Sequence, residues 1–294
     1  MTGGGGRLGG KVAIVTGAAR GVGRSVARAF AGEGAIVVIA DAGVELDGTR
    51  PSKSPAEATA AELTASGHAA HASFTDVTDP DQVQRLVDGT LERFGRVDIL
   101  VNAAAVMRHG SILDASVADW DAQIRVNATG TFNATRAVAA HWMRARSGGR
   151  LINFGSDAGL TGVESEVAYA ASKAAVIALK LSCAQTLKAY GVTSNVVHPQ
   201  AATRLTASIP VEELPDSARW ATGEFDPDHV PPALVYLASD AGHWVNGCVL
   251  ATYGYEVHLY RLAERARSIY SPGPWDQTVL DRRFQEAFGP PVRK

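Results

Sequence analysis

The feature that most constrains the fold is an alternation between short runs of β-branched residues and longer Ala-rich stretches of helical character. The runs expected to form strands lie at 12–15, 35–39, 69–74, 97–101, 150–154, 192–197 and 248–251. The stretches expected to form helices lie at 23–33, 56–66, 81–94, 117–146, 167–190 and 230–239. This rhythm predicts an α/β fold with a single Rossmann-type, doubly wound parallel sheet of about seven strands and helices on both faces.

The length and composition suit one large domain built around this sheet. Of the 294 residues, 46% are hydrophobic and 20% are charged, which is enough apolar surface for a sizeable core. We expect one domain over residues 1–255, in which the proline-containing segment 203–228 covers a substrate. The extension 256–294 carries Trp275 and Phe284, so it is expected to pack on the body or on a neighbouring subunit.

Charge and cysteine content exclude several classes of partner. The formal net charge is -2, which provides no basic field for nucleic acid or an anionic membrane surface. The only cysteines are Cys183 and Cys248, and no Cys or His spacing is typical of a metal site. Residues 1–10 lack the apolar core of a signal peptide, and no apolar run approaches the length of a membrane span. We therefore expect a cytoplasmic protein without metal, nucleic acid or membrane partners.

A glycine-rich turn follows the first strand and precedes the first helix. Glycines there let the backbone turn tightly and approach a pyrophosphate at the positive end of the helix. The pattern predicts a dinucleotide site, whose lining residues would be Gly17, Arg20, Gly21, Val22 and Gly23.

Asp41 ends the second expected strand, close to the offset at which an acidic residue bonds the adenosine ribose hydroxyls. A carboxylate there would repel a 2'-phosphate, which favours NAD over NADP. Arg20 argues the other way, because a guanidinium could pair with that phosphate. We favour NAD, because the Arg20 side chain is free to point to solvent in the NAD complex at no cost. The alternative role for Asp41 is that of an ordinary turn residue.

Tyr169 and Lys173 are four residues apart in an expected helix, so they lie one turn from each other on one face. A nearby ammonium and an oxidised nicotinamide both stabilise a phenolate and lower the pKa of the phenol. Ser156 follows the strand at 150–154, so it lies at the carboxyl edge of the sheet, where ligands bind. Its hydroxyl is suited to donating a hydrogen bond to a substrate oxygen.

The order and spacing of these elements resemble the short-chain dehydrogenase/reductase family over roughly residues 8–255. The resemblance is loosely to its hydroxysteroid and hydroxyacyl dehydrogenase subgroup. It rests on the glycine turn together with Asp41, Asp76, Val77, Asn102, Asn127, Ser156, Tyr169 and Lys173.

The resemblance implies an enzyme that transfers hydride between a nicotinamide cofactor and an alcohol or carbonyl substrate. Tyr169 would be the general acid/base and Ser156 would orient the substrate oxygen. Lys173 would hold the ribose and lower the pKa of Tyr169, and Asn127 would keep a water in a proton relay. A homotetramer or homodimer is also implied.

The remaining cofactor contacts implied by the resemblance lie at the ends of later strands. Asp76 and Val77 would lie near the adenine, Asn102 and Ala103 would also contact the cofactor, and Thr203 would approach the nicotinamide carboxamide. For Asp76 and Thr203 the alternative is an ordinary role in turns and caps.

The chain departs from the family pattern at two positions where glycine is usual, Ala105 and Gln200. If the backbone there needs a positive φ, either residue would be strained by about 1 kcal/mol or more.

Three classes of function stay open at this point. The first is a redox enzyme acting on a secondary alcohol or ketone, and the second is a member of the same family with non-redox chemistry such as dehydration or epimerisation. The third is a cofactor-sensing binding protein. The presence of Ser156, Tyr169 and Lys173 together argues against the third, since a pure binder needs no phenol and ammonium at this spacing.

Overall fold

The computed structural model describes residues 6–45, 49, 51–207, 216–261 and 264–288. By its internal contacts the chain divides into two compact units, Met1–Tyr260 and Arg261–Lys294. The first unit therefore ends five residues after the expected boundary at residue 255, because it includes a further strand.

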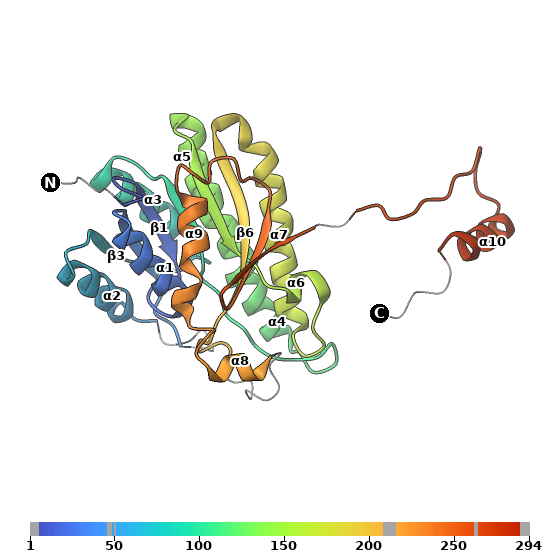
Figure 1. Ribbon diagram of the computed structural model, residues 1–294, viewed down its shortest axis with the longest axis horizontal. Helices are drawn as coiled ribbons and strands as arrows, with labels where there is room; N and C mark the ends of the chain where they lie inside the picture. The colour runs from blue at the N-terminus through green and yellow to red at the C-terminus, as the bar shows by residue number, and fades with distance from the viewer. Residues whose placement is uncertain (1–5, 46–48, 50, 208–215, 262–263, 289–294) are drawn as a thin grey trace. The chain divides into compact units, whose positions relative to one another are not determined.

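The first unit is built on one eight-stranded sheet with the strand order β3-β2-β1-β4-β5-β6-β7-β8 (Figure 1). The strands are β1 Val12–Thr16, β2 Ile36–Asp41, β3 Ala70–Phe74, β4 Ile99–Asn102, β5 Gly149–Phe154, β6 Val192–Gln200, β7 Val249–Tyr253 and β8 Glu256–Tyr260. Neighbouring strands from β3 to β7 are parallel, and β8 runs antiparallel to β7. The predicted doubly wound parallel sheet is confirmed, with one antiparallel strand added at its edge.

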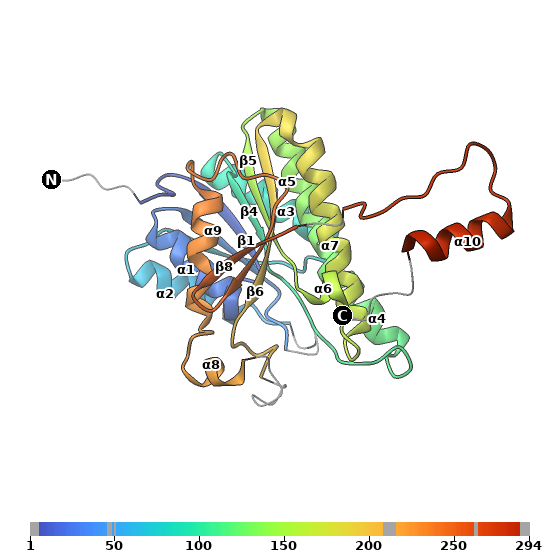
Figure 2. The same cartoon turned by 45° about the vertical axis from the view of Figure 1, so that its right-hand side comes forward.

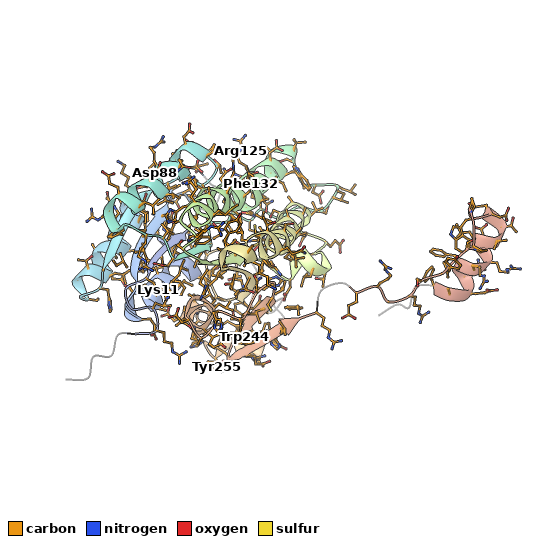
Figure 3. All side chains as sticks on the ribbon, turned by 90° about the horizontal axis from the view of Figure 1, so that it is seen from above. Lys11, Asp88, Arg125, Phe132, Trp244 and Tyr255 are labelled. Carbon is orange, nitrogen blue, oxygen red and sulfur yellow. The ribbon has the colours of Figure 1, made fainter. Side chains whose placement is uncertain are left out.

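Helices cover both faces of this sheet, as expected, with α1, α2 and α9 on one side and α3, α5 and α7 on the other (Figures 1 and 2). The helices are α1 Gly21–Gly32, α2 Ser54–Ala65, α3 Pro80–Phe94, α4 Val117–Gln123, η1 Ile124–Gly130, α5 Thr131–Ala145, α6 Ala158–Thr161, α7 Val167–Thr186, η2 Lys188–Tyr190, α8 Ser217–Ala221, η4 Pro227–His229, α9 Pro231–Ala238 and α10 Gln277–Phe288. Figure 3 shows Asp88 and Phe132 on the outer side of one helical layer and Trp244 and Tyr255 on the opposite side.

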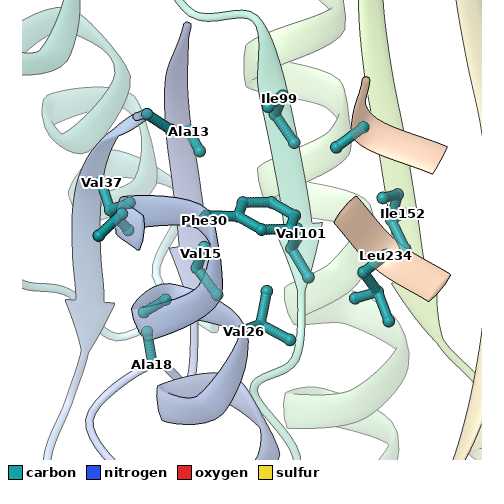
Figure 4. Packing of buried hydrophobic residues seen from close by; sticks show 14 of the residues in the cluster. Ala13, Val15, Ala18, Val26, Phe30, Val37, Ile99, Val101, Ile152 and Leu234 are labelled. Carbon is teal, nitrogen blue, oxygen red and sulfur yellow. The ribbon is translucent and has the colours of Figure 1, made fainter. Parts of the chain in front are cut away.

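Each face of the sheet has its own hydrophobic core, because the β-branched strands bury residues on both sides. Figure 4 shows Phe30 and Val26 of α1 packed against Val15 and Val101 of the two central strands. On the other face Trp142 is fully buried, and its indole nitrogen donates to the carbonyl oxygen of Val97 at 2.6 Å. Residues of β1 and β4 are buried in both cores, and both of these strands end at the candidate site.

The single helix expected at 117–146 is divided by the π-helical segment η1, which begins at Ile124 and ends at Gly130. Such segments widen one turn of a helix and occur often at functional sites. Asn127 lies within it, and the Thr131 hydroxyl donates to the carbonyl oxygen of Asn127 at 2.6 Å.

Helix α7 differs from the expectation that no segment has the length of a membrane span. This helix is long enough and, with a mean hydropathy of 1.4, apolar enough to cross a membrane. Of its apolar window, 44% is buried inside the protein. The helix also buries Lys173 and Lys180. These features are those of a core helix that packs on the sheet.

The second unit contains α10, in which the rings of Phe284 and Phe288 form an edge-to-face pair at 4.8 Å. The expected packing of the C-terminal extension on the body or on a neighbouring subunit stays a prediction.

Candidate active site

A cavity of about 710 Å³ opens at the carboxyl ends of the central strands. Most of the residues singled out in the sequence line it, namely Gly17, Arg20, Gly21, Val22, Gly23, Asp41, Asp76, Val77, Ala103, Ser156, Tyr169, Lys173 and Thr203. Asn102 and Asn127 do not line it. The fold therefore brings the glycine turn and the side chains of Ser156, Tyr169 and Lys173 into one space, as the spacing predicted.

The glycine turn is packed so closely that two of its glycines admit no side chain. A Cβ at Gly17, whose φ is 68°, would lie 2.6 Å from the backbone nitrogen of Ala104, and a Cβ at Gly23 would lie 2.2 Å from the carbonyl oxygen of Gly17. The helix α1 begins at Gly21, and no side chain caps its first turn. Uncapped N–H groups at a helix start suit a pyrophosphate, so the turn fits a dinucleotide.

Asp41 lies at the end of β2 and binds the backbone on both sides of it. Its Oδ2 accepts from the amide of Ala19 at 2.9 Å, and its Oδ1 accepts from the amide of Gly43 at 2.6 Å. The carboxylate is thus held at one end of the cavity by the glycine turn itself. The guanidinium of Arg20 is also engaged, since Nη1 donates to the carbonyl oxygen of Val44 at 2.9 Å.

Arg204 lines the same end of the cavity and was missed in the sequence. Its Nη1 lies 3.9 Å from Oε2 of Glu45, and burial together with the charge of Arg20 lowers the pKa of its guanidinium. The only signal in the sequence was its position directly after Thr203.

The residues after β3 and β4 divide between the cavity wall and the interior. Asp76 lines the cavity and accepts from the amide of Thr78 at 2.8 Å, in the manner of a turn residue. Asn102 is buried, and its Nδ2 donates to Oδ1 of Asn153 at 2.7 Å and to the hydroxyl of Thr135 at 3.1 Å. The side chain of Asn102 therefore ties β4 to β5 and α5 beneath the cavity floor.

Ser156 and Tyr169 both line the cavity, and the Ser156 hydroxyl is the polar group that favours the phenolate form of Tyr169. The Ser156 Oγ accepts from the amide of Ala158 at 3.2 Å, which leaves its own proton free to be donated. Burial raises the pKa of Tyr169, the negative charge of Glu166 raises it further, and the Ser156 hydroxyl opposes both effects. In the protein alone, the phenol therefore keeps its proton at neutral pH.

Lys173 lies one helical turn after Tyr169, as predicted, and is 4% exposed. Its Nζ donates to the carbonyl oxygen of Phe154 at 2.9 Å and lies 5.5 Å from the centre of the Tyr169 ring. Burial lowers the pKa of its ammonium to about 8. Burial and the charge of Glu166 raise the pKa of Tyr169, and the lowering of this pKa that was expected from the Lys173 ammonium stays a prediction.

Asn127 lies behind the cavity wall, where three hydrogen bonds occupy its amide. Its Oδ1 accepts from the amide of Val106 at 2.9 Å, and its Nδ2 donates to the carbonyl oxygen of Val106 and to Oγ of Ser172, both at 2.9 Å. The side chain thereby links the segment after β4 to the helix that carries Tyr169 and Lys173. Its expected part in a proton relay stays a prediction.

The segment after β6 contributes Thr203, which lies against the glycine turn. A Cβ at Gly21 would lie 3.7 Å from Cγ2 of Thr203. Part of the expected covering segment, residues 208–215, lies outside the described residues. The conditional strain at Ala105 and Gln200 is absent, because the only described non-glycine residues with positive φ are Arg146 and Asp216.

Glu166 is a second residue that sequence reasoning missed. It lies just before α7, its side chain is 13% exposed, and its Oε1 lies 3.9 Å from Nδ1 of His109. Burial raises the pKa of Glu166 itself. Its spacing of three residues from Tyr169 was the only signal available in the sequence.

Comparisons with known proteins find similarity along nearly the whole chain. A family model described as short chain dehydrogenase matches residues 11–212. A hydroxyacyl-CoA dehydrogenase from Mycobacterium tuberculosis is 36% identical over 289 residues, which cover 96% of this chain and 89% of that protein. A D-threitol dehydrogenase from Mycolicibacterium smegmatis is 37% identical over 262 residues, which cover 84% of this chain and 93% of that protein.

A solved structure extends this similarity to the fold. The crystal structure of a short chain dehydrogenase from Mycobacterium avium has a TM-score of 0.84 and 34% sequence identity, and the match covers 98% of each chain. The matched region contains the glycine turn and the segments that bear Ser156, Tyr169 and Lys173.

Proposed function

The chain belongs to the short-chain dehydrogenase/reductase family and is an oxidoreductase of CH-OH and C=O groups, and from this premise we propose that it is an NAD-dependent dehydrogenase of secondary alcohols. The observation that carries the proposal is the convergence of Ser156, Tyr169 and Lys173 on the cavity that begins at the glycine turn. A redox enzyme of this family needs these groups in one space, together with room for a dinucleotide.

The protein's own residues would handle the proton while the cofactor takes or gives the hydride. Tyr169 accepts the proton of the substrate hydroxyl, and Ser156 donates a hydrogen bond to the substrate oxygen. Because burial raises the pKa of Tyr169, the phenolate needs positive charge beside it. Lys173, held by the carbonyl oxygen of Phe154, supplies one such charge and would hold the nicotinamide ribose.

The preference for NAD rests on Asp41. Its carboxylate lies in the wall of the cavity and is fixed there by the amides of Ala19 and Gly43. A 2'-phosphate placed beside this carboxylate would be repelled by its negative charge and would also lose part of its hydration. Arg20 and Arg204 favour the opposite choice, but Arg20 is already bonded to the Val44 carbonyl oxygen and Arg204 lies near Glu45.

For the substrate we propose a hydroxyacyl compound, in which a secondary alcohol lies on an acyl chain. The support is the similarity to a hydroxyacyl-CoA dehydrogenase, which extends over 96% of this chain. The similarity to a threitol dehydrogenase supports polyols as the second class to be tested.

The test is the change in absorbance of the nicotinamide band when the purified protein is given each cofactor with hydroxyacyl thioesters, polyols and simple ketones. Reduction of NAD by a hydroxyacyl thioester is the expected result. Substrate consumption without any change in this band would instead favour the dehydratase or epimerase type of chemistry. Binding of NAD without turnover of any compound would favour a cofactor-sensing protein.

A further inference from the structure

A hydrogen-bonded cluster outside the catalytic cavity joins the strand β6, the turn that carries Ser156 and the edge strand β8. The imidazole Nδ1 of His198 and Oδ1 of Asp157 are 2.8 Å apart. The hydroxyl of Tyr260 donates to the same Asp157 oxygen at 2.8 Å. The rings of Tyr260 and His198 lie 5.5 Å apart. His198, Asp157 and Tyr260 are called the serine clamp below.

The imidazole of His198 holds both neighbours of Ser156. It is 3% exposed and lies so close beneath Gly155 that a Cβ at that position would be 2.6 Å from its Nε2. On the other side of Ser156, the same ring is bonded to Asp157. The His198 ring therefore approaches both residues that flank Ser156.

The geometry of Asp157 shows that its side chain is committed to this cluster. Asp157 occupies the cap position of the short helix α6, where an Asp side chain ordinarily bonds the first amides of the helix. No such bond forms here, because the carboxylate instead accepts from His198 and Tyr260. The bond with His198 lowers the pKa of Asp157, and burial raises the pKa of Tyr260 to about 12, so the acceptor stays charged and the donor keeps its proton.

The serine clamp lies on a different side of Ser156 from Tyr169. Ser156 lines both the main cavity and a second cavity of about 540 Å³, whereas Asp157, His198 and Tyr260 line only the second. The clamp residues are therefore not in the space where Tyr169 and Lys173 meet. Any influence on the reaction has to pass through the position of Ser156.

We propose that His198, Asp157 and Tyr260 are positioning residues that fix the Ser156 hydroxyl toward Tyr169, so that the edge strand β8 takes part in building the active site. This inference rests on the proposed function, because it assigns the clamp to the substrate-orienting serine. Tyr260 lies beyond the region 11–212 that the family model matches. The chain thus uses a segment outside that region to hold a residue inside it.

The test uses Tyr260→Phe, which removes one hydroxyl from a partly buried ring and keeps the fold. We expect kcat to fall about tenfold, the lower end of what a hydrogen bond to a charged group contributes, with NAD affinity unchanged. In a Ser156→Ala background the same change should lower kcat by less than about twofold, because Tyr260 acts through Ser156. A tenfold loss that persists in that background would overturn the proposal. Tyr255→Phe, at the turn before β8 and 74% exposed, is the matched control.

A second measurement does not depend on turnover. The amides of Gly159, Leu160 and Thr161 are bonded to the carbonyl oxygens of Ser156 and Asp157, so their hydrogen exchange reports on the turn. Exchange about tenfold faster in Tyr260→Phe and in Asp157→Asn, and unchanged in Tyr255→Phe, is expected. Unchanged exchange in both clamp variants would overturn the clamp. If the unmodified protein turned over no substrate with either cofactor, the proposed function would fail, while this exchange measurement would still decide whether the clamp holds the turn.

Discussion

Glu166 lies three residues before Tyr169 in the chain, and its carboxylate oxygen Oε1 lies 3.9 Å from the imidazole Nδ1 of His109. Its negative charge raises the pKa of Tyr169, and an enzyme that oxidises alcohols needs the phenolate of that tyrosine. A partly buried carboxylate at this position therefore opposes proton removal from the substrate.

We expect Glu166→Gln to lower the pKa of Tyr169, because the variant removes the repelling charge and keeps the shape of the side chain. The rate of alcohol oxidation should then reach half of its maximum at a lower pH than in the unmodified protein. The measurement is kcat/KM against pH, with Glu164→Gln, an exposed neighbour, as the control. A profile that stays in place, or that moves to higher pH, would show that Glu166 does not act on the phenol.

We expect Tyr169→Phe to reduce kcat by about 10² to 10⁴, the range that a general acid/base group supplies. The ring stays in place beside the Lys173 ammonium, so NAD binding should be unchanged in a fluorescence titration. Tyr270→Phe, which alters a ring that is 82% exposed in the second unit, is the control. Turnover that survives the loss of the Tyr169 hydroxyl would remove its assigned role in proton transfer.

We expect Phe30→Ala to lower the free energy of unfolding by about 3–5 kcal/mol, because it leaves a cavity beside the two central strands. Phe30 is fully buried among Val15, Val26 and Val101 (Figure 4). Phe132→Ala, at a ring that is 46% exposed, should change the free energy by less than about 1 kcal/mol. Denaturant unfolding compares the two, and equal losses would contradict this account of the core.

Strands β1 and β2 could be predicted from the sequence because each buries a run of mostly β-branched residues. Strand β8 could not, since four of its five residues are exposed and Glu256 and His258 interrupt its apolar pattern. The π-helical segment around Asn127 was not predicted either, for a different reason. Asn127 in this segment is bonded to Val106 and Ser172, which are 21 and 45 residues away, so no local spacing in the sequence reveals these contacts.

The same contrast holds at the site. Tyr169 and Lys173 lie in one helix, so their spacing in the sequence predicted that they are close together. The position of Ser156 directly after β5 predicted that it lies at the same edge of the sheet. His198 and Asp157 are 41 residues apart in the chain, and Tyr260 is 103 residues from Asp157. No local pattern links such residues, because only the order of the strands in the sheet brings them together.

We expect Asp41→Asn to weaken NAD binding and to shift the preference between cofactors toward NADP by about tenfold. The variant removes the negative charge that repels a 2'-phosphate but keeps one oxygen for the amide of Ala19 or Gly43. Arg20 and Arg204, at the same end of the cavity, would then face the phosphate without that charge beside them. Dissociation constants for both cofactors, measured by fluorescence titration at fixed salt, give the ratio.

The matched control for this change is Asp76→Asn, because Asp76 also lines the cavity and also accepts a backbone amide, here that of Thr78. If the cofactor preference depends on charge beside the ribose, only the variant at Asp41 should change the ratio of the two dissociation constants. An equal shift in both variants would mean that the net charge of the cavity, and not the position of Asp41, decides the preference. Tighter binding of NADP than of NAD by the unmodified protein would reverse the assignment, because Arg20 and Arg204 would then outweigh the Asp41 carboxylate.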